Sequence, residues 1–201
     1  MAHTNEFIEL RAQEVLRLAG ALSVPVDLER VAAALEVRVH DEELESEVSG
    51  VLIVKGKERH ILVNKAHHAN RRRFTVAHEL GHFCLHDDDG DRMFIDHQMR
   101  VYHRVGEANA PAYTQPGATT DPRQEREANM FAAALLMPAP LVTRAALERD
   151  MWDELDVTSM AKTFGVSEQA MSIRLQQLKV VSVDFDAERP EVAAGSAAMG
   201  G

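Results

Sequence analysis

Residues 78–82 of the chain, HELGH, place two histidines four positions apart with a glutamate directly after the first. In a helix, residues i and i+4 differ by about 40° of rotation and about 6 Å of rise, so His78 and His82 present their imidazoles to one point. This spacing suits two ligands of a tetrahedral zinc ion. Glu79 then lies beside the metal, where its carboxylate can serve as a general base towards water. The alternative is that both histidines lie on an ordinary polar helix face.

A third ligand decides between these interpretations, and the sequence offers several candidates. His86 continues the same face, but it lies a further turn along and is expected to pack in the core or to support a ligand. The downstream helix in DPRQEREANMFAAALLMP carries two glutamates. We expect Glu125 to be the third ligand, with Asn129 four residues later on the same face and hydrogen-bonded to a ligand histidine. Glu127 lies about 200° away around that helix; it is expected to face solvent and is kept as the alternative ligand.

Hydrolysis of a peptide bond also needs a donor that stabilises the negative charge of the tetrahedral intermediate. The segment between the two predicted helices supplies four residues that could do this, two histidines and two tyrosines, and the sequence does not choose among them. The candidates are His97, Tyr102, His103 and Tyr113.

The elements that must position these residues follow from periodicity and capping signals. The first predicted helix, over 5–22, has an apolar face expected to comprise Phe7, Leu10, Val15, Leu18 and Leu22. Two β-branched runs around KGKE predict a hairpin, and Asp121 followed by Pro122 predicts the start of a long helix. The remaining predicted elements are a short helix after Asp27, a strand near 37–40, the hairpin over 50–63, the motif helix over about 67–85, and helices near 140–149 and 156–178.

Composition limits the class of protein. A formal net charge of −10 disfavours direct binding of nucleic acid, and the dense basic run, RRR at 71–73, is expected to be a solvated helix start. No apolar run approaches the roughly 20 residues of a membrane span, and the first residues lack the apolar centre of a signal peptide. The single cysteine allows no internal disulfide. These features together favour a cytoplasmic protein.

Residues 157–178, VTSMAKTFGVSEQAMSIRLQQL, have the pattern of a helix-turn-helix, with Gly165 in the turn and Ser167 as cap of the second helix. As a DNA reader, this segment would expose a set of polar side chains to bases and phosphates. One arginine beside one glutamate is a weak phosphate footprint, so packing or partner docking is favoured over DNA reading. The set comprises Ser167, Glu168, Gln169, Ser172 and Arg174.

RRRFTVAHELGHFCLH, followed downstream by EREANMFAAALLMP, resembles the ImmA/IrrE family of metallopeptidases, and the similarity extends over roughly residues 20–180. The resemblance implies a zinc-dependent endopeptidase with one zinc per chain, bound by His78, His82 and Glu125, and with Glu79 as general base. It further implies a protein substrate, typically a helix-turn-helix transcriptional repressor whose cleavage derepresses stress or mobile-element genes.

The sequence thus predicts an α+β fold: a small zincin-like metallopeptidase core over 1–149, with a short β-sheet packed on the motif helix. A helix-turn-helix-like subdomain over 150–185 and a disordered tail over 186–201 are predicted to follow. One strand of 37–40 or 50–63 is expected to be the sheet edge beside the metal, where an extended substrate could add by main-chain hydrogen bonds. The rival hypothesis is a DNA-associated regulator with a structural or vestigial metal site.

Overall fold

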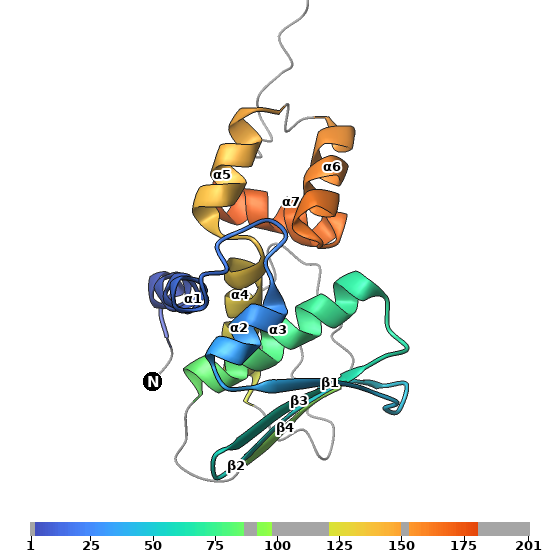
Figure 1. Cartoon of the computed structure of the whole chain (residues 1–201). Helices are drawn as coiled ribbons and strands as arrows, with labels where there is room; N and C mark the ends of the chain where they lie inside the picture. The colour runs from blue at the N-terminus through green and yellow to red at the C-terminus, as the bar shows by residue number, and fades with distance from the viewer. Residues whose placement is uncertain (1–2, 87–91, 98–120, 150–152, 181–201) are drawn as a thin grey trace, which may run out of the picture.

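A computed structural model of the chain describes residues 3–86, 92–97, 121–149 and 153–180 (Figure 1). The fold is α+β, with a four-stranded sheet and seven helices in the described residues. In chain order the elements are α1 (Asn5–Ala19), α2 (Leu28–Ala34), β1 (Arg38–Glu42), β2 (Val48–Lys55), β3 (Glu58–Asn64), α3 (Ala69–Leu85), β4 (Arg92–His97), α4 (Pro122–Leu136), α5 (Ala139–Leu147), α6 (Glu154–Phe164) and α7 (Glu168–Gln177).

The sheet has the strand order β1-β3-β2-β4, with β1 parallel to β3 and both other pairs antiparallel. The predicted hairpin is therefore confirmed as β2–β3, but it forms the centre of the sheet. The edges are β1, near the predicted strand at 37–40, and β4, for which no definite strand was predicted. A bulge between Val48 and Gly50 offsets the pairing of β2 with β4.

The helices lie on one face of the sheet, and α3 crosses that face directly (Figure 1). Leu52 and Ile61, which are paired across β2 and β3, belong to the apolar core on that face and are fully buried. Helix α4 packs on α3, and α1 packs in turn on α4. The motif helix is thus held between a sheet and a second helix, which fixes the directions in which its side chains can point.

The apolar face predicted for the first helix is wrong in most of its members. α1 buries Ile8, Ala12, Val15 and Leu16. These four positions follow the i, i+4, i+7, i+8 spacing of one helix face, whereas the predicted residues drift around the helix. Of the predicted set only Val15 is buried, and the exposed members are Phe7, Leu10, Leu18 and Leu22.

The predicted turn signals of the C-terminal segment are confirmed. Gly165 ends α6 in the left-handed conformation with φ of 66°, and the Ser167 side chain accepts a hydrogen bond from the backbone N–H of Ala170 at the start of α7. Helices α6 and α7 pack against each other, and the backbone carbonyl of Val166 accepts a hydrogen bond from Asn70 at the start of α3. The segment is therefore joined to the helix that carries the motif.

Arg174 does not belong to an exposed set of the kind that DNA reading would require, and its contacts agree with the favoured packing role. Its side chain is 3% exposed and forms a two-pronged ion pair with Glu9 on α1. Its Nε also donates to the backbone carbonyl of Met137, at 2.9 Å. A buried guanidinium needs such partners, and both lie far away in sequence, so the local helix pattern did not reveal them.

The three arginines at the start of α3 are not simply solvated. Arg73 donates to the backbone carbonyls of Val26 and Gly165, at 2.9 and 3.2 Å, and Arg71 donates to Ser49 Oγ at 2.9 Å. Arg72 forms an ion pair with Asp41 on β1. These contacts tie α3 to the sheet and to the C-terminal helices, so the basic run has a structural role.

Taken one at a time, the helices of the described segments are all too short or too polar to cross a membrane. Joined end to end, α4 and α5, which are bent by 51° relative to each other, reach the length and apolar composition that a membrane span needs.

Candidate metal centre

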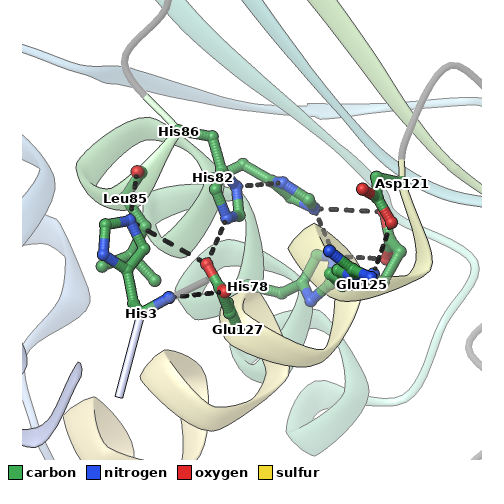
Figure 2. Close-up of polar contacts among 9 residues, drawn as sticks. His3, His78, His82, Leu85, His86, Asp121, Glu125 and Glu127 are labelled. Carbon is green, nitrogen blue, oxygen red and sulfur yellow. Dashed lines mark hydrogen bonds and ion pairs between the residues drawn. The ribbon is translucent and has the colours of Figure 1, made fainter. Parts of the chain in front are cut away.

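Two imidazoles and one carboxylate converge between α3 and α4 (Figure 2). His78 Nε2 and His82 Nε2 lie 3.0 Å apart, and they lie 3.3 Å from Glu125 Oε2 and from Glu125 Oε1, respectively. Four ligands held about 2.0 Å from a tetrahedral zinc ion lie about 3.3 Å from one another. The two imidazole nitrogens and the Glu125 carboxylate therefore already lie at separations close to those that such an ion requires, and one donor atom from each residue lies within 4.8 Å of the others.

The electrostatics of His82 and Glu125 favour a cation. Burial lowers the pKa of His82 to about 4, although the hydrogen bond with Glu125 opposes the shift, so the ring is neutral at pH 7. Burial raises the pKa of Glu125, but hydrogen bonds and charge interactions with His78 and His82 outweigh it and bring the pKa below its usual range. A neutral imidazole and an ionised carboxylate are the protonation states in which these two groups bind metals.

Close packing of the two helices brings Glu125 to the histidines. A β-carbon added at Gly81 would lie 3.0 Å from both the Cα and the carbonyl oxygen of Ala128. Gly81 therefore allows another element to approach α3 closely, and that element is α4. Asn129, one residue further along α4, lies with its Oδ1 3.0 Å from His78 Nδ1.

Glu79 lies on the sheet side of α3. Its side chain is fully buried, and a β-carbon added at Gly50 of β2 would lie 3.2 Å from its Oε1 and would overlap Thr75 Cγ2. Gly50 thus leaves room for the carboxylate beneath the sheet. The local reason is the bulge in β2, which places a residue without a side chain at the point where α3 crosses the strand.

Glu127 does not face solvent, and the prediction that it would do so is wrong. It is 8% exposed, and its Oε2 lies 3.2 Å from His86 Nε2. The rotation of about 200° from Glu125 is correct for a helix. It directs Glu127 towards the end of α3 because the two helices pack side by side. Glu125 is the acid of α4 that lies within the donor cluster, and Glu127, the alternative ligand, does not belong to it.

Sequence reasoning missed Phe94 of β4. Its ring stacks on that of His82, with centroids 4.9 Å apart, so β4 is the edge strand that reaches the cluster. Of the four proposed oxyanion donors, Tyr102, His103 and Tyr113 lie outside the described residues. His97 is the last residue of β4, and its side chain also lies outside them.

An α+β fold in which a His-Glu-x-x-His helix and a second helix bring two imidazoles and a carboxylate together defines a domain of the metallopeptidase type. Residues 32–176 match the IrrE N-terminal-like domain, peptidase family M78. The match covers well over half of the chain, and the chain belongs to this family. A comparison with curated proteins found no match.

Proposed function

We propose that this chain is a zinc-dependent endopeptidase, with one zinc ion bound by His78, His82 and Glu125. The observation that carries the proposal is the convergence of two Nε2 atoms, 3.0 Å apart, on the Glu125 carboxylate, one oxygen of which lies 3.3 Å from each nitrogen in turn. Two imidazole nitrogens and one carboxylate oxygen leave a fourth position open, which is the arrangement of catalytic zinc sites. Two of the three residues, His78 and His82, also lie on α3, the helix that carries Glu79.

Glu79 and Asn129 have separate roles in the proposed hydrolysis. A zinc ion bound there supplies Lewis-acid polarisation of a water molecule and of the scissile carbonyl. Glu79 accepts the proton of the attacking water and passes it to the leaving amine. Asn129 accepts a hydrogen bond from Nδ1 of His78 and so keeps Nε2 of that ring directed at the metal.

We place the substrate along β4. This strand is paired with β2 on one side and is an edge of the sheet on the other, and its Phe94 contacts His82. An extended peptide that adds to the edge by main-chain hydrogen bonds would run past the donor cluster. The central strands of the hairpin cannot serve, because both of their edges are already paired in the sheet.

We further propose that the substrate is a transcriptional repressor of the helix-turn-helix type, and that its cleavage derepresses stress or mobile-element genes. Main-chain pairing distinguishes poorly among sequences, so recognition must come from a separate docking surface. The formal net charge of −10 suits a partner with basic patches, as DNA-binding proteins have. In the rival hypothesis, a DNA-associated regulator would use Arg174 to contact bases or phosphates. That side chain is instead buried and paired with Glu9.

Metal analysis tests the metal site. Protein purified without chelator should contain close to one zinc per chain, and His78→Ala or Glu125→Ala should lose it while retaining the fold. Glu58→Ala, an exposed acid on β3, is the matched control and should keep the zinc. A wild-type chain that is metal-free and cannot be reconstituted with zinc rules out the proposed function.

The substrate is best identified with a Glu79→Gln variant used as a trap. This change keeps the three donors and removes the general base, so a bound partner should remain uncut. The captured protein is then incubated with the wild-type chain, and its fragments are sequenced. Capture of a repressor that the wild-type chain does not cut would refute the substrate assignment.

A further inference from the structure

A second chain of polar groups leaves the metal centre from the far side of His82. His82 Nδ1 lies 3.0 Å from His86 Nδ1, and His86 Nε2 lies 3.2 Å from Glu127 Oε2. The other oxygen of Glu127 accepts a hydrogen bond of 2.9 Å from the backbone N–H of His3 (Figure 2). None of these three outer residues belongs to the donor cluster.

Burial makes this chain unlike an ordinary surface network. His86 is 6% exposed and Glu127 is 8% exposed, so each loses most of its contact with water. Burying a polar or charged group costs free energy unless it is hydrogen-bonded, and apolar side chains could fill the same space without that cost. A role in packing alone therefore does not account for a histidine and a glutamate at these two positions.

Binding of a metal through Nε2 would determine the direction of both hydrogen bonds that His86 makes in the chain. A neutral His82 that uses the Nε2 lone pair for the metal carries its proton on Nδ1 and donates it to His86 Nδ1. His86 must then carry its own proton on Nε2, and it donates this proton to Glu127. The chain ends on a carboxylate that accepts hydrogen bonds from both His86 and the backbone of His3.

We infer that His86 and Glu127 are positioning residues of the metal centre, which hold the His82 ring and the tautomer in which it binds zinc. The inference rests on the proposed function. Partners of this kind orient a ligand histidine and make it a better donor to the metal. His78 has a neutral amide, Asn129, in the place that His86 takes beside His82, where a carboxylate, that of Glu127, follows one step further out.

His3 has a lesser part in the arrangement. Its ring stacks on Phe7 with centroids 4.7 Å apart, and its Nε2 lies 3.1 Å from the backbone carbonyl of Leu85. Its contact with Glu127 Oε1 uses the backbone N–H, which any residue except proline would retain. His3→Ala should therefore change zinc affinity much less than a substitution at His86 or Glu127.

The experiment measures zinc affinity by competition with a chromophoric chelator, and the visible spectrum of the cobalt-substituted protein. His86→Phe keeps a ring but removes both nitrogens, and it should weaken zinc binding by about 10- to 100-fold and alter the cobalt spectrum. His86→Gln can still accept from His82 and donate to Glu127, so it should restore most of the affinity. Unchanged affinity and spectrum in folded His86→Phe overturn the inference.

Glu127→Leu tests the other end of the chain, and it decides the matter if His86→Phe does not fold. It should weaken zinc binding by at least about tenfold, while Glu127→Gln, whose amide oxygen still accepts, should have a smaller effect. Asn64→Ala is the control, because it removes a buried amide bonded to the carbonyls of Leu44, Glu45 and Val48. It should lower stability without changing zinc affinity.

The outcomes separate this inference from the function on which it rests. A wild-type chain that binds no zinc removes both. A wild-type chain that binds zinc, with a folded Glu127→Leu variant that binds it equally well, overturns the positioning role and leaves the proposed peptidase intact.

Discussion

The helix pairs α3–α4 and α6–α7 both bury charged or ionisable side chains, but the two regions differ in what those side chains face. Between α3 and α4, the histidines and Glu125 turn their donor atoms towards one another. In α7, the buried Arg174 is neutralised by Glu9 and by a backbone carbonyl. The first region directs two imidazoles and one carboxylate towards a single point. The second only supplies one guanidinium with an ion-pair partner and a hydrogen-bond acceptor. The first arrangement suits chemistry and the second suits stability.

The comparison predicts its largest effect at Glu79. Glu79→Gln should lower the rate of cleavage of the trapped partner by about 10²- to 10⁴-fold, because general-base assistance is lost while the metal ligands remain. Thermal unfolding and zinc content should stay close to those of the wild-type chain. Glu58→Gln, an exposed acid on β3, is the matched control and should cleave normally. Retained cleavage by Glu79→Gln would show that another group is the base.

Arg174 should give the opposite result, a large loss of stability with no loss of metal. Arg174→Met leaves Glu9 and the Met137 carbonyl without their partner, and breaking a buried pair costs about 3–5 kcal/mol. Glu9 is partly exposed, so we expect the lower end of that range. Denaturant unfolding measures the cost, with Lys162→Met on the exposed side of α6 as control. Zinc affinity of the folded fraction should be unchanged, and a loss of zinc would mean that the two regions are coupled.

The metal centre and the Arg174–Glu9 pair also show where prediction from sequence succeeds and where it fails. His78, His82, Glu125 and Asn129 were grouped by i, i+4 spacing on two helices, and the structure brings these four side chains together. Their placement depends on helix geometry, which is local. The Arg174–Glu9 pair joins residues 165 positions apart. Nothing in the periodicity of either helix specifies such a partner.

The strands show the same limit. The hairpin over 50–63 could be predicted because β-branched runs flanked a short polar turn. Its place in the centre of the sheet could not, since that depends on β1 and β4, which pair from distant parts of the sequence. The edge beside the metal was consequently assigned to the wrong segment, and Phe94 was missed.

Gly81 lies at the point where the metal-binding region depends most on packing, and its substitution should have an intermediate effect. Replacing a glycine by alanine in an exposed helix usually stabilises the protein, by up to about 1 kcal/mol. Here the added carbon would meet the backbone of Ala128, so Gly81→Ala should destabilise by about 1–3 kcal/mol. It should also weaken zinc binding by moving Glu125 away from the histidines. A more stable variant with normal zinc affinity would contradict this account of the α3–α4 contact.

The smallest expected effect concerns the exposed side of α7, which we retain as a docking surface for the partner. The burial of Arg174 removes it from that surface, and Ser167 and Glu168 remain exposed. Glu168→Lys reverses a charge that faces solvent in the first turn of α7. It should cost about 0.3–1 kcal/mol in stability, because a cation is unfavourable at a helix N-terminus. A basic partner should bind more weakly, which raises KM several-fold, more so at low salt, while kcat and zinc content stay constant. Lys162→Glu on α6 is the converse control, and it should leave KM constant or lower it. If Glu168→Lys cuts the partner with an unaltered KM at low salt, this face of α7 is not the docking surface.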